Sequence, residues 1–350
     1  MIPEEIIEIP ASLQRSQFLA AASVAGFQLA GAAPAAPMDD YPIYNQWVTG
    51  GLAGPMAYLA DHRAPLRADP RSLLSSARSV LCLGLLYNTP GPAAPISRYA
   101  WGAGDYHDLL RHRLTSLVQS LEQVWGAFEY KICVDTAPLL ERSLARLAGL
   151  GWIGRNTCLI NQSSGSWFFL GEILTSVELE PDRPPPDRCG SCTRCVDACP
   201  TQALVPAPDG RWRLDARLCI STWTIEQHGA LPAAHRSASG QHVFGCDICQ
   251  EVCPWNSRAP FTAEPAFQPA NPGYDLAELA TLTPESFRQR FRHTPVWRAK
   301  YAGLMRNVAT AMGNSGDPRH IEPLRRLATY PDAAISEHAL WALGRLERIA

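Results

Sequence analysis

Lysine is almost absent from this chain of 350 residues, in which only Lys131 and Lys300 occur. Arginine therefore supplies nearly all of the positive charge, and because this bias runs evenly along the chain we draw no functional conclusion from it. A large net charge is also missing: the formal value is −2, so any contact with nucleic acid must depend on local charge. No apolar run is long enough to span a membrane. The 46% apolar and 18% charged residues indicate an ordinary globular protein of two or three domains.

The N-terminal region lacks the features of an export signal, although residues 16–36 are rich in alanine and other apolar residues. Arg15 precedes this stretch without a second arginine beside it, and Gln28 interrupts the apolar run. The preceding residues are net negative because they include Glu4, Glu5 and Glu8. These features argue against a signal peptide. We predict instead a helix through about Ala22, a strand over 26–33 and a cytoplasmic protein.

Cysteine is crowded into one segment, since eight of the eleven cysteines lie between residues 189 and 254. The segment opens with C-G-S-C-T-R-C-V-D-A-C-P and closes with C-D-I-C-Q-E-V-C-P. In the bacterial spacing, three cysteines of such a run hold one 4Fe–4S cluster and the fourth holds the other. We assign cluster one to Cys189, Cys192, Cys195 and Cys253, and cluster two to Cys199, Cys219, Cys246 and Cys249.

Two other uses of cysteine fit this pattern less well. Structural zinc sites take four ligands in two close pairs, and a third close cysteine does not suit them. Disulfide frameworks are typical of small secreted domains, whereas this chain has 350 residues and one crowded segment. The spacing therefore predicts two 4Fe–4S clusters and one-electron chemistry.

Residues 1–180 alternate between predicted helices and strands, which favours an α/β or α+β fold, and we predict α+β. The apolar run from Ser79 to Leu86 predicts a strand that is buried on both faces. Leucines at helical spacing predict a helix over 105–125. Further elements are predicted as a strand over 130–134, a helix from Pro138 to Leu147 and an extended segment over 167–177.

Proline-rich segments at 181–187 and 260–272 mark two domain boundaries. They divide the chain into 1–180, a ferredoxin-like domain over 181–262 and a helical domain over 263–350. The helical tail contains a weak repeat whose two copies end at Gly313 and Gly344. Such a period is typical of paired-helix repeats, so we predict a HEAT-like domain.

Residues 286–316 contain six basic side chains and no aspartate or glutamate. Basic helical repeats commonly bind phosphate backbones, so Arg288, Arg290 and Arg292 are candidate nucleic-acid contacts. The alternative is a solvated helix face, which is the usual explanation of a charge run.

Two features of the first domain have an ordinary structural explanation beside a functional one. Gly149, Gly151 and Gly154 match a dinucleotide-binding motif, but that motif must follow a strand and open a helix. Here it follows a predicted helix, so we predict turns. Asp135 ends a predicted strand just before a helix, where aspartate is common as a cap. Its functional alternative is a proton donor whose pKa is raised beside a large apolar cofactor.

Several motifs occur together in an order that is similar to epoxyqueuosine reductases. They are I-S-R-Y-A-W-G-A-G-D-Y-H (96–107), V-D-T-A-P-L-L-E-R (134–142), A-G-L-G-W-I-G-R-N-T (148–157), L-G-E-I-L-T (170–175), the first cysteine run, L-C-I-S-T-W-T-I-E (218–226) and F-G-C-D-I-C-Q-E-V-C-P-W-N (244–256). The resemblance runs from about Gly26 to the end of the chain. It rests on the whole ordered set, because cysteine runs alone are unspecific.

The resemblance implies a nitroreductase-like first domain that binds cobalamin beside the two clusters. It implies reduction of epoxyqueuosine at the wobble position of transfer RNA, with electrons from a donor such as flavodoxin or ferredoxin, and we expect a monomer. By the same resemblance Asp135 is the proton donor and His228 a candidate RNA contact. The implied cobalamin neighbours are Tyr58, Arg98, Asp135, Leu159, Leu170, Ser221 and Asp247.

Two other functions remain open at this point. Reductive dehalogenases use the same cofactors, but they are usually exported with a twin-arginine signal. A non-catalytic electron carrier would leave the first 180 residues without a role.

Overall fold

The computed structural model describes residues 10–91, 95–270 and 274–348, so the acidic residues that precede Arg15 lie outside its described part. A four-stranded sheet lies at the centre of the first domain, with strand order β1-β2-β6-β3 and antiparallel pairing throughout. Its strands are β1 (Leu29–Pro34), β2 (Ser79–Leu86), β3 (Tyr130–Cys133) and β6 (Phe168–Thr175).

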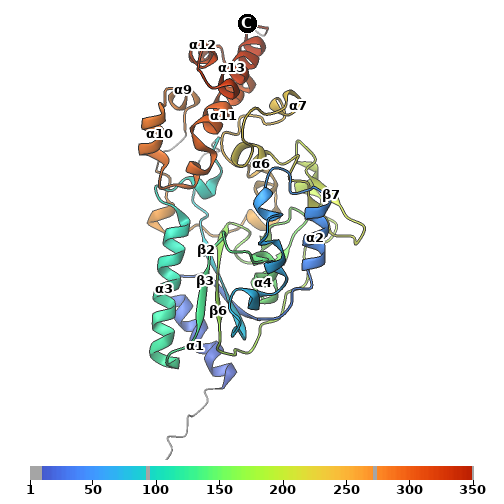
Figure 1. The fold of residues 1–350 in the computed structure, drawn as a ribbon, viewed down its shortest axis with the longest axis vertical. Coiled ribbons are helices and arrows are strands. Elements are labelled where there is room, and N and C mark those ends of the chain that lie inside the picture. The colour runs from blue at the N-terminus through green and yellow to red at the C-terminus, as the bar shows by residue number, and fades with distance from the viewer. Residues whose placement is uncertain (1–9, 92–94, 271–273, 349–350) are drawn as a thin grey trace, which may run out of the picture.

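Helices cover this sheet on both faces (Figure 1). The helices α1 (Ala11–Val24) and α3 (Tyr106–Trp125) lie on one face, and α4 (Glu141–Leu147) lies on the other. Every residue of β2 is buried. The prediction of a strand buried on both faces is therefore confirmed, although its neighbours are antiparallel. The mixture of helices and antiparallel strands agrees with the predicted α+β class.

The helix α3 has clear sequence signals at both ends. The Asp105 side chain caps its N-terminus by accepting a hydrogen bond from the His107 N–H. Leucines at helical spacing, from Leu110 to Leu121, pack on the sheet. The helix ends at Gly126, whose φ of 78° is in the region that favours glycine.

The helix α4 begins at Glu141, three residues later than predicted. The preceding residues form tight turns instead. Asp135 has a φ of 55°, and the Thr136 N–H donates to the Val134 carbonyl at 2.5 Å. After α4, Gly149 has a φ of 79° and leads into the short strand β4 (Trp152–Ile153). The glycine motif at 149–154 therefore forms turns, as predicted, and does not open a helix.

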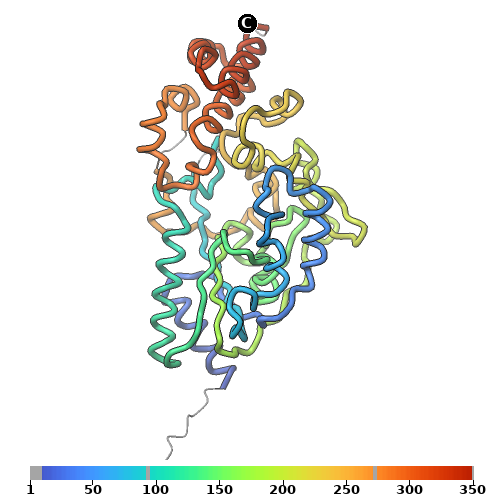
Figure 2. Tube along the Cα trace, in the orientation of Figure 1, coloured from blue at the N-terminus to red at the C-terminus, as the bar shows by residue number. Residues whose placement is uncertain are grey.

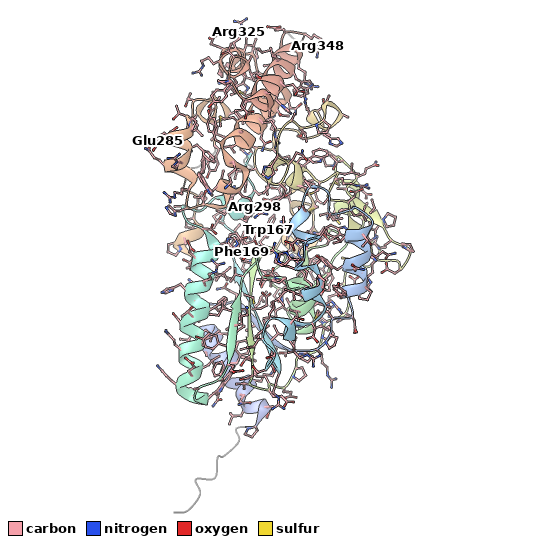
Figure 3. The ribbon with its side chains drawn as sticks, viewed as in Figure 1. Trp167, Phe169, Glu285, Arg298, Arg325 and Arg348 are labelled. Carbon is pink, nitrogen blue, oxygen red and sulfur yellow. The ribbon has the colours of Figure 1, made fainter. Side chains whose placement is uncertain are left out.

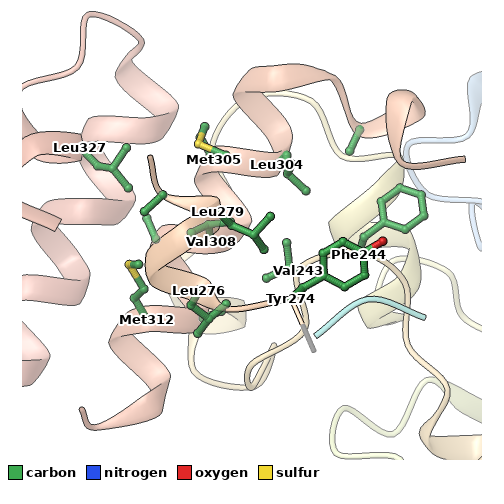
Figure 4. Packing of buried hydrophobic residues seen from close by; sticks show 14 of the residues in the cluster. Val243, Phe244, Tyr274, Leu276, Leu279, Leu304, Met305, Val308, Met312 and Leu327 are labelled. Atoms are coloured by element: carbon green, nitrogen blue, oxygen red, sulfur yellow. The ribbon is translucent and has the colours of Figure 1, made fainter. Parts of the chain in front are cut away.

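The helices α11 (Lys300–Ser315) and α13 (Ala333–Leu346) pack closely against each other in the C-terminal tail. Gly313 allows this approach, because a Cβ at this position would lie 2.6 Å from the Cβ of Ala342. Their core also takes up Val243 and Phe244 of the cysteine-rich segment (Figure 4). The tail therefore rests on an earlier part of the chain, as the tube in Figure 2 also shows.

The remaining elements are short. In the described residues, no helix has the length and apolar character needed to cross a membrane. The other helices and strands are α2 (Tyr41–Thr49), β5 (Leu159–Ile160), α5 (Arg194–Asp197), β7 (Leu204–Pro206), β8 (Trp212–Leu214), α6 (Ile220–Ile225), α7 (Ala233–Arg236), α8 (Ile248–Glu251), α9 (Leu276–Leu279), α10 (Pro284–Phe291) and α12 (Ile321–Ala328), with 3-10 turns at η1 (Ala57–Leu59), η2 (Ala64–Ala68), η3 (Pro70–Ser72), η4 (Arg98–Ala100), η5 (Pro254–Asn256), η6 (Pro265–Phe267), η7 (Pro295–Ala299) and η8 (Pro318–His320).

Candidate functional site

The first predicted group of cluster cysteines comes together in space. A pocket of about 230 Å³ is lined by all four of its members, Cys189, Cys192, Cys195 and Cys253. The pKa of Cys195 is raised to about 11, mainly by burial and to a smaller extent by the neighbouring Cys189 and Cys253. Cys253 follows the other three by more than fifty residues, so the fold produces the crossed arrangement that the spacing predicted.

The second predicted group also gathers. Burial raises the pKa of Cys246 to about 12, and both Cys219 and Cys199 contribute to the rise as neighbouring charges. Cys249 has Cys246 and Cys219 among its charged neighbours. Within the described residues, no three cysteine, histidine or acidic side chains converge closely enough to hold a single metal ion. In a 4Fe–4S cluster each thiolate binds a different iron, so the ligands of such a cluster do not need to converge on one metal ion.

Asp247 and Arg98 link the second group of cysteines to the first domain. The backbone N–H of Arg98 donates to Asp247 Oδ2 at 2.7 Å. The Arg98 guanidinium lies over the rings of Trp167, at 4.6 Å, and Trp101, at 5.2 Å. Burial raises the pKa of Asp247 to about 6, although the Arg98 N–H opposes the rise. Two residues that the sequence predicted separately therefore contact each other.

A cleft of about 770 Å³ lies between the first domain and the cysteine-rich segment. Tyr44 and Trp47 of α2 line it from one domain, and Cys219 and Ser221 line it from the other. Gly154 also lines it. Ligand pockets are commonly about 300–1,000 Å³, so this cleft is large enough for a bulky cofactor. Cys219 belongs to the second cysteine group, so one member of that group lies at the wall of the cleft.

Three polar side chains form a hydrogen-bonded chain at the end of the sheet. Asp105 Oδ1 lies 2.6 Å from His107 Nδ1, and His107 Nε2 lies 3.1 Å from Asp135 Oδ2. Tyr106 stacks on both the His107 ring and Phe169, with centroids 4.1 Å apart in each case. The imidazole is therefore fixed by two carboxylates and an aromatic face. The Asp135 side chain remains 52% exposed, which leaves it able to touch a ligand.

The two carboxylates change the proton affinity of His107. Burial alone would lower the pKa of His107, but hydrogen bonds to Asp105 and Asp135 outweigh burial and raise it to about 9. Burial would likewise raise the pKa of Asp135, but the hydrogen bond and charge of His107 outweigh it, and the pKa of Asp135 is lowered. At neutral pH the pair therefore carries one proton, which resides on the imidazole.

This arrangement corrects the expectation that burial raises the pKa of Asp135. The expectation did not include His107, which sequence reasoning did not select as a site residue. His107 was nevertheless visible as the last residue of the 96–107 motif, and Asp105 occurs two residues before it. The sequence signal for this site was therefore an aspartate two residues before a histidine, at the start of a predicted helix.

Arg298 connects the tail to this site. Its guanidinium pairs with Glu226 at 2.6 Å and lies 5.2 Å from the centre of the Tyr58 ring. The Asp135 carboxylate also acts on Arg298 and helps to raise its pKa, after the larger contribution of the hydrogen bond to Glu226. Figure 3 shows Arg298 near Trp167 and Phe169, where the tail meets the first domain.

The predicted cobalamin neighbours are not all found at the cleft. Ser221 lines it, as predicted. Leu159 instead lies in the apolar core, where it is 4% exposed, and Leu170 packs against the same core. Strands β5 and β6 turn these side chains toward α4, which explains the difference. Tyr58, Arg98, Asp135 and Asp247 also lie outside the residues that line this cleft.

The basic segment 286–316 is less available to RNA than its sequence suggested. Arg306 is 1% exposed and donates to the backbone carbonyls of Gln227, Gly229 and Trp223, so it holds the chain after α6 and cannot face a phosphate. Acids from outside the segment pair with three further arginines. These pairs are Arg288–Glu285, Arg290–Glu278 and Arg298–Glu226.

Arg290, Arg292 and His228 differ in how far they are exposed. Arg290 is only 19% exposed and packs over Tyr274 and Phe291, so packing accounts for much of its position. Arg292 is exposed and has no ion pair among the described residues. His228 is also exposed and shares a pocket of about 350 Å³ with Lys300.

The fold and the site together define an iron–sulfur oxidoreductase in which a double-cluster segment faces an α+β domain. A family model of a 4Fe-4S double cluster binding domain matches residues 188–256, and one described as epoxyqueuosine reductase QueG, DUF1730, matches residues 67–136. Epoxyqueuosine reductase of Xanthomonas campestris pv. campestris is 40% identical over 336 residues, which cover 92% of this chain and 93% of that protein. The chain belongs to the epoxyqueuosine reductase family.

Solved structures agree with this assignment. A crystal structure of epoxyqueuosine reductase with an epoxyqueuosine-modified tRNA-Tyr stem loop has a TM-score of 0.83 at 30% identity, covering 95% of this chain and 89% of that one. A structure from Bacillus subtilis, described as having its catalytic aspartate loop swung out of the active site, has a TM-score of 0.84 at 29% identity and covers 95% and 90% of the two chains.

Proposed function

We propose that this protein reduces epoxyqueuosine to queuosine at the wobble position of transfer RNA. The observation that carries the proposal is the cleft whose wall includes a cysteine of the second group, with the Asp105–His107–Asp135 chain in the adjoining domain. Electrons enter from the cysteine-rich segment, and protons come from the carboxylate–imidazole pair. Both are needed, because loss of the epoxide oxygen as water takes two electrons and two protons.

The residues of the cleft fit a large, partly apolar cofactor, and we infer that this cofactor is cobalamin. Tyr44, Trp47 and Ile225 offer apolar surface, and Ser221 offers a hydroxyl. Cobalamin supplies two-electron reduction of the substrate carbon when it is bound. Tyr58, Arg98 and Asp247 stay predicted neighbours of the same cofactor, with Arg98 and Asp247 acting as one contact.

Asp135 delivers the first proton to the epoxide oxygen in this proposal. An alkoxide is a poor leaving group near neutral pH, so the oxygen needs an acid within hydrogen-bond reach. Asp135 is a carboxylate at neutral pH, so it first takes the proton that His107 Nε2 holds at 3.1 Å and then passes that proton to the epoxide oxygen. Asp105 keeps the imidazole oriented through Nδ1. The lowered pKa of Asp135 is compatible with this role, because the proton is stored on His107.

The Asp135 loop has to admit a bulky nucleoside, and we infer that it moves. The Bacillus subtilis relative is described with its catalytic aspartate loop swung out of the active site. Asp135 lies in a tight turn with a positive φ, a conformation that persists only when its surroundings hold it.

Transfer RNA is the proposed macromolecular substrate, since a relative is described in complex with a modified tRNA stem loop. Arg288, Arg292 and His228 are exposed candidates for phosphate contacts, and Arg290 is a weaker one because it is largely covered. We further propose a flavodoxin or ferredoxin as electron donor and a monomeric enzyme.

We also propose the domain limits 1–180, 181–262 and 263–350. In this division the first domain is nitroreductase-like and the third is HEAT-like. Support comes from the separate apolar cores of the sheet and the tail, and from the close packing of α11 on α13.

The proposal is tested with anaerobically purified protein, added cobalamin, a chemical reductant and transfer RNA that contains epoxyqueuosine. We expect queuosine by mass spectrometry of the digested RNA. Failure to form queuosine with both clusters and cobalamin bound would overturn the proposal. Dehalogenation of a brominated phenol under the same conditions would favour the rival reductive dehalogenase function instead.

A further inference from the structure

Glu172 is a fully buried carboxyl group in the centre of the sheet, and the reaction proposed above does not use it. It lies on β6 and is 0% exposed. Its register partners are Cys82 on β2 and Cys133 on β3. All three belong to the sheet face that α4 covers, where the other side chains are apolar. A carboxylate in such surroundings is costly unless donors surround it.

No such donors are present around this side chain in the part of the chain that the structure describes. Neither Oε1 nor Oε2 of Glu172 finds a hydrogen-bond donor there. The polar neighbour of Glu172 is the carboxyl group of Glu141, and two carboxyl groups can bond to each other only when one carries a proton. Burial raises the pKa of Glu172 well above its ordinary value, and the charge of Glu141 raises it further. Burial therefore favours the protonated form of Glu172, which can then donate to Glu141.

Glu141 connects this buried acid to the active-site loop. It is the first residue of α4, and its Oε1 accepts the backbone N–H of Asp135 at 2.7 Å. Burial and the Asp135 charge raise the pKa of Glu141 to about 7, while the Asp135 N–H and Glu172 oppose the rise. Glu141 thus changes charge near neutral pH, and the group that it holds is the backbone of the proposed proton donor.

The Asp135 turn depends on contacts of this kind. A non-glycine residue at φ 55° in a three-residue turn is strained, so outside contacts must fix it. Such contacts are present: the side chain is bonded to His107 and the backbone N–H to Glu141. A carboxylate accepts an N–H bond about twice as strongly as a neutral acceptor does.

We propose that Glu141 is a positioning residue that fixes the Asp135 loop as a carboxylate, and that protonation of Glu141, next to the already protonated Glu172, releases the loop. The inference rests on the proposed function, in which Asp135 must both point at the substrate and let it enter. A proton on Glu141 weakens the hold on Asp135. Loss of that proton restores the hold and presents the acid.

Other ionisable groups around the pair do not duplicate this role. Cys82 and Cys133 flank Glu172, and burial raises the pKa of each, so both stay neutral thiols. Arg142 is the nearby cation that favours the charged form of Glu141, and Asp135 is the anion that disfavours it. Lys131 and Asp182 act on the flanking cysteines. Glu141 is thus the group of this set that changes charge near pH 7.

The test is amide hydrogen exchange of the 134–140 segment in the full-length protein with its clusters in place, without substrate. Exchange is corrected for its intrinsic pH dependence. Protection of the Asp135 amide should fall as pH drops from about 8 to about 5.5, by up to about tenfold per unit below 7. Glu141→Gln should be less protected at the upper pH and should show no such fall. The control is Glu122→Gln on α3, a helix that contains neither Glu141 nor the 134–140 segment. This variant should show the wild-type dependence of protection on pH.

Changes at Glu172 separate the proton from the shape of the side chain. Glu172→Gln keeps a neutral donor to Glu141 and should retain the protected loop. Glu172→Leu removes the donor and should move the fall in protection to higher pH. The proposal is overturned if wild-type protection does not depend on pH, or if Glu141→Gln keeps the wild-type dependence. If Glu141→Gln does not fold, the pH dependence of amide protection in wild type and in Glu172→Leu still tests the proposal. None of these measurements requires turnover, so failure of the proposed reaction leaves their outcome unaffected.

Discussion

The cysteine groups and the Asp135 site handle charge in opposite ways. Burial raises the pKa of the cluster cysteines, so their thiolates depend on bound metal for stabilisation. In the Asp135 site, by contrast, charged partners already surround one another, with one imidazole between two carboxylates and a carboxyl pair behind them. The first region is completed by its cofactor, whereas the second is complete in the protein alone.

Because of this difference, the two regions should respond differently to substitution. Removal of one cysteine takes a corner from an iron–sulfur cluster, and the whole cluster is at risk. Removal of one group from the Asp135 site changes where a proton resides, and the remaining groups readjust. We therefore expect abrupt losses in the cysteine region and shifts of pH dependence in the other.

The largest expected effect follows from Cys253→Ala. Cys253 shares a pocket with Cys189, Cys192 and Cys195, so its loss should remove cluster one. Iron should fall from about eight to about four per chain, with a matching loss of acid-labile sulfide. Iron analysis and electron paramagnetic resonance measure the change.

The matched control is Cys158→Ser, because Cys158 is partly buried close to Cys249 and Cys253 but belongs to neither predicted ligand set. It should retain about eight irons. Two intact clusters in Cys253→Ala, or a missing cluster in Cys158→Ser, would show that the assignment of ligands is wrong.

A smaller effect is expected for His107→Gln, which keeps a polar side chain but cannot store the proton. Wild-type activity should decline above about pH 9, where His107 loses its proton. The variant should lose roughly a hundredfold at neutral pH, because no protonated imidazole is left to supply Asp135. Single-turnover rates across the pH range test this, and an unchanged profile would exclude His107 as the proton store.

His107 should also make the stability of the protein depend on pH. The pKa of His107 rises from 6.5 to about 9 on folding, so its contribution is fully present below 6.5 and disappears as the pH rises through 9. The melting temperature of wild type should therefore decline more steeply across this window than that of His107→Gln. Equal slopes would mean that the Asp105–His107–Asp135 chain does not form in solution.

The smallest effect is expected on the basic segment of the tail. Neutralising Arg288, Arg290 and Arg292 together should weaken tRNA binding and flatten its salt dependence, by roughly 0.7 to 0.9 for each phosphate that the protein no longer neutralises. Because Arg288 and Arg290 are already paired with acids, we expect a change that corresponds to about one phosphate and not to all three arginines. Arg325→Gln on α12 serves as control, because Arg325 is an exposed arginine outside this segment and is likewise paired with an acid, Glu322. An unchanged salt dependence would mean that these arginines lie on a solvated helix face and do not contact RNA.

The gathering of the first four cysteines could be predicted from the sequence. Three of them follow a spacing rule along the chain, and the distant Cys253 is marked by a second run of the same form. The strand Ser79–Leu86 was equally predictable, since its apolar run is continuous. Local patterns of this kind need no knowledge of the tertiary fold.

The proton site was predicted only in part because it is assembled from separate elements. Asp135 follows β3, His107 lies in the first turn of α3, Glu141 begins α4 and Glu172 lies on β6, so no sequence window contains them all. The pKa of Asp135 was expected to rise for the same reason: its partner is twenty-eight residues away. Arg306 shows the opposite case, in which a local pattern was misleading. It lies in a basic segment that was expected to face RNA, but its side chain is buried against backbone carbonyls.

The central claim is that electrons and protons reach the epoxide from these two different regions. It is tested most directly by Asp135→Asn, with product and cluster signals followed in the same anaerobic sample. Both clusters and cobalamin should remain bound, and the clusters should be reduced as in wild type. Queuosine should nevertheless form about a hundred to ten thousand times more slowly, which is the usual range for removal of a general acid. Formation of queuosine at the wild-type rate across about pH 6 to about pH 8 would contradict the account.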